Sequence, residues 1–159
     1  MTAPNSSFVF RAASNADLPA IRALVFGVLA EYGLAPDDSG IDADLADLEA
    51  SYFAPGGLFE IVVDPEGAIA GCCGVFRLDE TTCELRKMYL RKDARGHGLG
   101  KRFLERALAF ARSRGFRRME LETASVLKEA IALYTRAGFT PIERKHLACR
   151  CDQAFALAL

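Results

Sequence analysis

The residues best suited to binding chemistry lie in one short segment, residues 95–102, which reads Arg-Gly-His-Gly-Leu-Gly-Lys-Arg. Its glycines allow a tight turn in which several backbone N–H groups point at one anion. A helix is predicted to begin at Leu99, and its N-terminus adds the positive end of the helix dipole. The side chains of Arg95, Lys101 and Arg102 add full positive charges. The segment therefore predicts a cradle for a pyrophosphate group.

Two common phosphate-binding loops do not match this segment. A Walker A loop needs glycine, four residues and then Gly-Lys-Ser/Thr. Counting back from Gly100 puts Arg95 at the first glycine, and Arg102 replaces the hydroxyl residue that binds magnesium. A Rossmann loop needs its third glycine where Lys101 stands. Neither loop type is present.

What fits is Arg-x-x-Gly-x-Gly, with Arg95, Gly98 and Gly100 at its fixed positions. In this respect the chain resembles the GNAT superfamily of N-acetyltransferases, whose acetyl-CoA signature has this spacing. A second segment, Leu133–Phe139, reads Leu-Tyr-Thr-Arg-Ala-Gly-Phe and is similar to the family's Leu-Tyr-x-x-x-Gly-Phe. One glycine loop alone is a weak signal, but two motifs in this order are specific together.

The elements that must position these motifs follow from apolar periodicity and turn residues. Their predicted order is β-α-α-β-β-β-α-β-α-β-β. Strands are expected at 8–11, 58–63, 68–78, 83–90, 116–123, 139–147 and 153–159, and helices at 17–32, 42–53, 99–114 and 126–137. This is an α/β chain, and the resemblance implies a mixed α+β sheet with the GNAT-like acyl-CoA N-acyltransferase fold. We expect a single N-acetyltransferase domain over 1–159, with residues 1–7 disordered.

The resemblance implies acetyl-CoA as cosubstrate and no metal. The cofactor would be bound by the strand before the loop, through its free backbone groups, and by the loop itself. These residues are Met88, Tyr89, Leu90, Arg95, Gly96, His97, Gly98, Leu99, Gly100, Lys101 and Arg102. The alternative for Met88, Tyr89 and Leu90 is a plain buried strand. Many relatives carry an asparagine where Leu127 stands, so that one contact to the pantetheine arm is in doubt.

In the family pattern the tyrosine of the second motif, here Tyr134, points at the sulfur and protonates the departing thiolate. A thiol with a pKa of about 8.5 leaves more readily when it is protonated. The structural alternative is a tyrosine packed in the core with its hydroxyl bonded.

The attacking amine must be neutral, and free amines have pKa values of about 10, so some group must take a proton. Glu84 lies eleven residues before Arg95, and histone-type relatives place their general base at this offset. The resemblance therefore implies Glu84 as the base. The alternatives are an ion pair between Glu84 and Arg86 on one strand face, and Glu120 or Glu122 as the base.

Composition excludes several classes of protein. The 159 residues are 51% apolar and 26% charged, which is typical of a globular chain. Two histidines and five cysteines without metal-ligand spacing predict no metal site. No uncharged stretch exceeds ten residues, whereas a spanning helix needs about 20. No secretory signal is recognisable, so we expect a cytoplasmic protein with reduced thiols and no membrane partner.

Charge divides unequally along the chain. Residues 1–83 carry a net charge of −10 and residues 84–159 a net charge of +9. Either the halves attract each other within the fold, or they face partners of opposite sign. The second reading predicts a cationic acceptor amine, steered by an acid-rich stretch expected to face outward. This stretch comprises Asp37, Asp38, Asp42, Asp44, Asp47 and Glu49. Exposed carboxylates that serve only solubility are the alternative.

The predicted function is acetyl transfer from acetyl-CoA to a primary amine by direct attack, on a small molecule or a peptide. A non-catalytic acyl-CoA-binding or regulatory module is the alternative. The basic residues from Arg106 to Arg118 are spread around a helix without an aromatic platform, so no nucleic-acid partner is expected. The chain is expected to be a monomer or a homodimer.

Overall fold

The computed structural model describes residues 7–159. The disorder expected for residues 1–7 therefore falls almost wholly on residues outside the described range. Seven strands form one sheet in the order β1-β2-β3-β4-β5-β7-β6. The strands are β1 Val9–Ala12, β2 Leu58–Val63, β3 Ile69–Arg77, β4 Thr82–Leu90, β5 Arg118–Thr123, β6 Thr140–Ile142 and β7 Gln153–Ala158. Neighbours pair antiparallel except β4 and β5, which pair parallel. The mixed α/β class is thereby confirmed.

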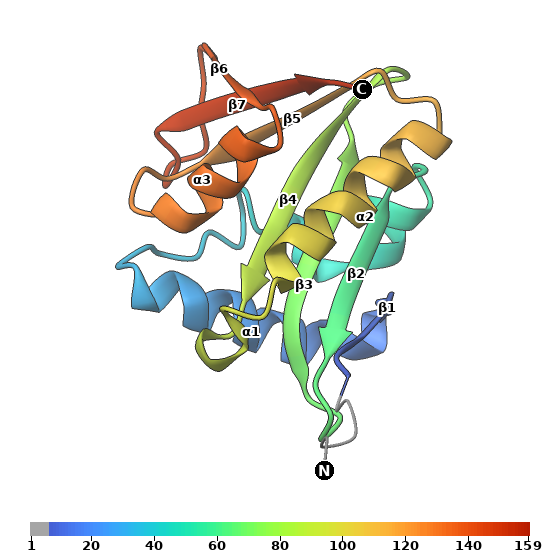
Figure 1. Ribbon diagram of the computed structural model, residues 1–159, viewed down its shortest axis with the longest axis vertical. Coiled ribbons are helices and arrows are strands. Elements are labelled where there is room, and N and C mark those ends of the chain that lie inside the picture. The colour runs from blue at the N-terminus through green and yellow to red at the C-terminus, as the bar shows by residue number, and fades with distance from the viewer. Residues whose placement is uncertain (1–6) are drawn as a thin grey trace.

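Helices cover both faces of this sheet (Figure 1). They are α1 Leu18–Glu31, α2 Leu99–Ser113 and α3 Lys128–Arg136. α2 crosses one face of the sheet, and α1 lies against the other, so two apolar cores form. Adjacent residues of β3 divide between them: Cys72 packs in the core of α1, and Cys73 in that of α2. No helix among residues 7–159 is long and apolar enough to cross a membrane.

Two expected elements differ from the structure. The helix predicted over 42–53 is broken into a 3₁₀ helix at Ala43–Ala46 and a π-helical turn at Glu49–Phe53, because Asp47 is extended between them. The Asp47 carboxylate accepts hydrogen bonds from Asn15 and from the Ala50 amide. The strand predicted over 139–147 is only Thr140–Ile142, because the chain then leaves the sheet and places Arg144 among carboxylates.

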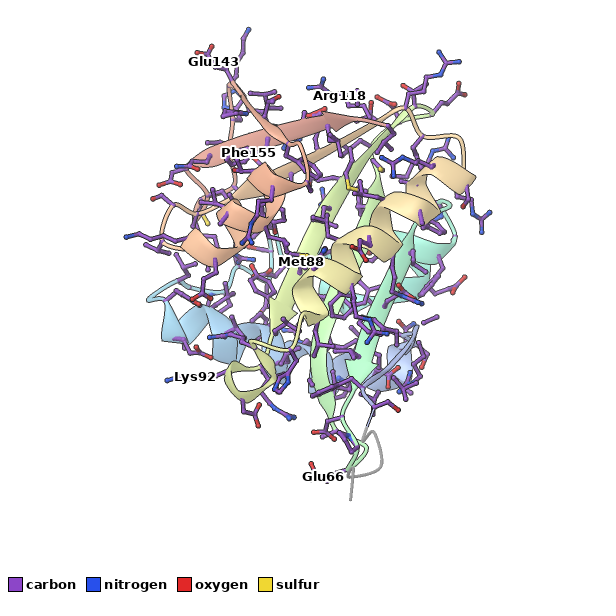
Figure 2. The ribbon with its side chains drawn as sticks, viewed as in Figure 1. Glu66, Met88, Lys92, Arg118, Glu143 and Phe155 are labelled. Carbon is purple, nitrogen blue, oxygen red and sulfur yellow. The ribbon has the colours of Figure 1, made fainter. Side chains whose placement is uncertain are left out.

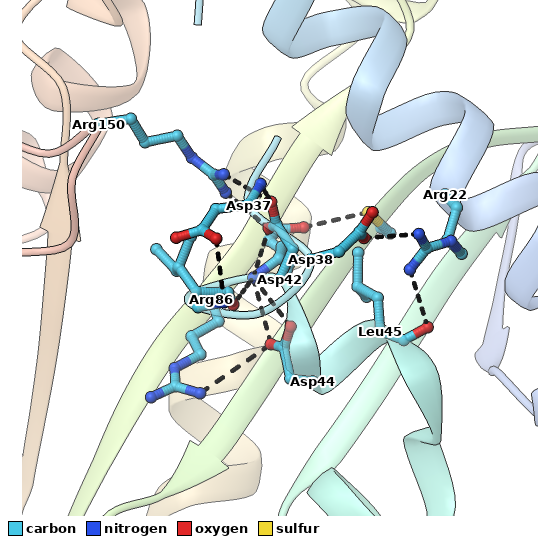
Figure 3. Close-up of polar contacts among 12 residues, drawn as sticks. Arg22, Asp37, Asp38, Asp42, Asp44, Leu45, Arg86 and Arg150 are labelled. Carbon is cyan, nitrogen blue, oxygen red and sulfur yellow. Dashed lines mark hydrogen bonds and ion pairs between the residues drawn. The ribbon is translucent and has the colours of Figure 1, made fainter. Parts of the chain in front are cut away.

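The outward orientation expected for Asp42 and Asp44 is wrong, since both residues are buried. Figure 3 shows these acids meeting basic side chains from distant segments. Lys87 Nζ lies 3.3 Å from Asp42 Oδ1 and 3.1 Å from Asp44 Oδ1. Arg150 donates two hydrogen bonds to Asp42, of 2.7 and 2.8 Å, and the Tyr52 hydroxyl donates one to Asp44. A buried carboxylate needs such partners, so these two acids form a structural charge cluster rather than a steering surface.

The Asp42 carboxylate makes the free energy of unfolding depend on pH in acid. Burial raises its pKa, but hydrogen bonds from Arg150 and the Asp37 amide and the charge of Lys87 outweigh burial and lower the pKa to about 2. Compared with an unfolded aspartate, this contributes about 2 kcal/mol of stability. Because the folded-state pKa is the lower one, the contribution is present above about pH 4 and lost as pH falls through about 2.

We predict that Asp42→Asn lowers the free energy of unfolding at pH 7 by about 3 kcal/mol, because Lys87 and Arg150 then lack a charged partner. Urea unfolding at pH 7 and at steps below pH 4 measures this, and the gap from the parent protein should narrow as acid is added. Asp38→Asn is the control, because its exposed carboxylate should contribute under about 1 kcal/mol. Equal unfolding free energies for the two variants would contradict the prediction.

Candidate active site

The centre of the sheet opens where β4 departs from β5. These strands pair only from Thr82 with Arg118 to Glu84 with Glu120. On its other edge β4 contains a bulge, because Cys72 pairs with Tyr89 but Gly74 already pairs with Arg86. Two residues of β4 thus face one residue of β3, and such a bulge bends its strand. The bend leaves the β5-facing edge of the last residues of β4 unpaired with that strand.

A cavity of about 320 Å³ fills this opening. Most residues expected to bind the cofactor line it, and Figure 2 shows one of them, Met88, on β4 beside α2. The lining includes Met88, Tyr89, Leu90, Arg95, Gly96, Gly98, Leu99, Gly100 and Lys101, together with the expected catalytic residues Glu84 and Tyr134. The fold therefore brings both sequence motifs to one cavity.

The glycine loop forms the end of the cavity at the start of α2. Gly96 and Gly98 have φ values of +82° and +75°, a conformation that strains residues with a Cβ. The Arg102 amide makes the first helical bond, to the Gly98 carbonyl, so the amides before it are without intrahelical acceptors. These features can bind an anion.

Three residues of the loop have other contacts in the structure. Arg95 donates to the Leu90 carbonyl at 2.9 and 3.1 Å and to Glu31 at 2.8 Å, so it ties the loop to β4 and α1. His97 and Arg102 lie outside the cavity lining. The His97 ring is 5.6 Å from that of Phe8, and the Arg102 guanidinium is 4.5 Å from the ring of Phe10.

Tyr134 projects from α3 and is 94% buried, with its ring 5.9 Å from that of Phe139. Among residues 7–159 no hydrogen bond involves its hydroxyl, and the hydroxyl oxygen is not among the fully buried unpartnered atoms. Burial raises the pKa of Tyr134 well above its ordinary value, and the nearby Cys73 and Tyr89 raise it further. A neutral phenol without a protein partner therefore remains available to donate to a bound molecule.

Glu84 is buried, and both of its carboxylate oxygens are engaged. Oε1 accepts a 2.6 Å hydrogen bond from Arg86 Nε, and Oε2 lies 2.9 Å from Arg144 Nη1. The ion pair with Arg86 considered as the structural alternative is therefore present. Glu84 nevertheless lines the cavity, so the contact does not remove it from the site.

The two competing glutamates differ in access. Glu120 pairs with Arg144 at 2.8 Å and Arg118 at 3.2 Å and lies outside the cavity lining. Burial raises the pKa of Glu120, but the hydrogen bonds from these arginines lower it overall. Glu122 lines the cavity, and its contacts to Arg144 and the Ala148 amide are longer, 3.3 Å each.

Several charged residues of this region were not singled out from the sequence. Arg144 joins three carboxylates, those of Glu84, Glu120 and Glu122, and Arg150 also lines the cavity. The sequence contained a weak signal for Lys87, because Cys83, Leu85 and Lys87 are every second residue and would share one face of a regular strand. A lysine on an apolar strand face indicates a buried ion pair.

Comparison with known proteins points to the same family as the two sequence motifs. A family model described as the acetyltransferase (GNAT) family matches residues 28–139. The chain is 42% identical over 146 residues to "Uncharacterized N-acetyltransferase YjgM" of Escherichia coli K12, covering 89% of this chain and 86% of that protein. It is 29% identical over 128 residues to "Uncharacterized N-acetyltransferase C1271.07c" of Schizosaccharomyces pombe, covering 80% and 78% respectively.

Solved structures share the fold. A GNAT-family acetyltransferase from Staphylococcus aureus Mu50 superposes with a TM-score of 0.89 at 19% identity, over 96% of this chain and 99% of that one. The yncA protein of Salmonella typhimurium, whose structure contains its cofactor acetyl-CoA, gives a TM-score of 0.75 at 24% identity, over 96% and 94%. The chain therefore belongs to the GNAT family of acetyltransferases.

Proposed function

We propose that this enzyme transfers the acetyl group of acetyl-CoA directly to a primary amine, with Tyr134 as the proton donor and Glu84 as the proton acceptor. The observation that carries the proposal is the Tyr134 hydroxyl, which has no hydrogen-bond partner within residues 7–159 and belongs to a residue that lines the cavity. Because the hydroxyl oxygen is not among the fully buried atoms that lack a partner, it is accessible and can donate to a molecule bound in the cavity.

The residues around the cavity fit acetyl-CoA. The loop at Gly96 and Gly98, the first amides of α2 and the Lys101 ammonium suit a pyrophosphate. The edge of Met88, Tyr89 and Leu90 that is unpaired with β5 offers backbone groups to the amides of a pantetheine arm, apart from the Leu90 carbonyl, which accepts from Arg95. When bound, acetyl-CoA supplies an acetyl group activated as a thioester.

Tyr134 can donate to the sulfur because a phenol keeps its proton at physiological pH. The upward shift of its pKa on burial favours the protonated, hydrogen-bond-donating form. A thiolate is a better leaving group when a proton is delivered as it departs. Donors held in a dry cavity interact more strongly with a developing charge than donors in water.

Glu84 can receive the amine proton directly or through water. Its two guanidinium partners hold it in place but also occupy both oxygens. Glu122 is the second candidate, because it lines the same cavity through weaker contacts. Each glutamate can therefore be tested against the other.

The cofactor assignment predicts an effect at Gly100. A Cβ there would lie 3.5 Å from Leu133 Cδ2 and 3.7 Å from Leu90 Cδ1, ordinary contacts within the cavity wall. Gly100→Val should fold but narrow the cavity and weaken acetyl-CoA binding by about 10-fold or more. Calorimetric titration with acetyl-CoA measures this. Gly27→Val, in the exposed face of α1 with open space around its Cβ, is the control and should bind normally.

Tyr134→Phe should reduce turnover by about 100-fold and leave acetyl-CoA affinity nearly unchanged, because only the proton donor is removed. Thiol release with pooled amines and a binding titration separate these effects. The melting temperature should change little, since the hydroxyl makes no hydrogen bond within the described residues. Parental turnover would return Tyr134 to a packing role.

Glu84→Gln should lower the rate most at low pH, where the amine is mainly protonated and its deprotonation limits the reaction. At high pH, where the free amine is abundant, the variant should approach the parent. A pH–rate profile of unchanged height and shape would assign the base elsewhere. Glu122→Gln, measured in parallel, should then show the pH-dependent loss.

A further inference from the structure

A second cavity, of about 490 Å³, adjoins the first. It lies between residues 40–44, β4 and residues 146–148, and it shares Ile41, Glu84, Arg86 and Glu122 with the first cavity. If acetyl-CoA occupies the first cavity, the second is the route by which another molecule can approach the shared carboxylates. The inference below therefore rests on the proposed function.

Arg86 is the basic residue of β4 that lines this second cavity. Its Nε donates to Glu84, and its guanidinium carbon lies 3.6 Å from the centre of the Phe76 ring. The carboxylate of Glu84 and the ring of Phe76 thus fix the plane of the guanidinium. The side chain keeps 23% of its surface exposed.

The outer edge of this guanidinium has one long ion pair and no hydrogen bond within the described residues. Within residues 7–159, neither Nη1 nor Nη2 donates a hydrogen bond, and Asp44 Oδ2 lies at 4.0 Å from Nη1. Figure 3 shows the Arg86 head group beside Asp44, with a dashed line for this long ion pair. A fixed guanidinium with two parallel N–H donors is suited to a carboxylate, which it can bind in bidentate fashion.

The remaining charges of the cavity define the other end of the ligand. Asp44 is engaged by Lys87, Tyr52 and, at 4.0 Å, Arg86, and Glu84 is engaged by two arginines. Among the described residues, the contacts of Glu122 are the two of 3.3 Å. An ammonium group can therefore lie against Glu122 and Glu84 while a carboxylate lies on Arg86. The exposed His146 at the cavity wall adds a further possible donor to an anion.

We propose that the acceptor is a free α-amino acid, whose carboxylate is bound by Nη1 and Nη2 of Arg86 and whose amino group faces Glu84 and Glu122. This differs from the cationic acceptor expected from the acid-rich stretch, because Asp42 and Asp44 are buried and paired. Acetylation forms an amide bond at the amino nitrogen, breaks the thioester bond and leaves CoA as the free thiol. The amine proton passes to Glu84, to Glu122 or to water.

The test compares acceptors that differ only in the carboxylate. The twenty protein amino acids are each assayed beside the corresponding amide and the decarboxylated amine, by thiol release from acetyl-CoA. At least one amino acid should have a kcat/KM about 10- to 100-fold above that of its amide and its amine. The inference is overturned if no amino acid is acetylated, or if amides and amines match the acids throughout, whatever other amines are accepted.

Arg86→Gln tests whether this residue makes the discrimination. The ratio of kcat/KM for the acid to that for its amide should fall toward one, mainly through a higher KM for the acid. Equal losses for acid and amide would mean that Arg86 only positions Glu84, and would overturn the assignment. Arg106→Gln is the matched control, because Arg106 also pairs with a buried glutamate and lies near a phenylalanine ring, but lines neither cavity.

Failure of this inference differs from failure of the proposed function. Calorimetric titration of the parent protein with acetyl-CoA is run beside the acceptor screen. Normal acetyl-CoA binding with acetylation of polyamines or amino sugars, but of no amino acid, refutes only the acceptor class. Absence of acetyl-CoA binding refutes the proposed function itself.

Discussion

The shape of the candidate active site depends on one residue, Lys87, which lies within β4 but has a left-handed backbone with φ of +56°. For a residue other than glycine this conformation costs about 1–2 kcal/mol. Leaving one charge of a buried pair unpartnered costs about 3–5 kcal/mol, so separating its ammonium group from Asp42 and Asp44 would cost more than relief of the strain would gain. The bulge that contains Lys87 turns β4 away from β5, and both cavities lie where these two strands separate.

The two halves of the chain, of opposite charge, are joined by ion pairs of this kind. Asp42 with Arg150, Glu60 with Arg106 and Asp64 with Arg91 all connect an acid of the first half to a base of the second. Attraction between the two halves of the chain, one of the two explanations offered for their opposite charge, is therefore present in these contacts. Arg144 contacts Glu84, Glu120 and Glu122, so that these like-charged carboxylates can lie close together, two of them in the cavity lining.

Sequence analysis located the features that depend on residues close together in the chain. The glycine loop before α2, the apolar stripe of α2 and the tyrosine of α3 are short-range patterns, and the structure has each element within a few residues of its expected position. The broken segment after Asp42 was not predictable in this way. Its acids have helical spacing, but their orientation is decided by Lys87 and Arg150, the latter 108 positions away. Contacts at such separation leave no periodic trace in the sequence.

The charge cluster also sets an order of events for a chain synthesised from its N-terminus. Asp44 leaves the ribosome 43 residues before Lys87, and Asp42 leaves 108 residues before Arg150. Until both bases have emerged, the two carboxylates lack the partners that make burial favourable, and they stay hydrated. Residues 40–44 therefore dock only after Arg150 has been made, which is later than the glycine loop and α3.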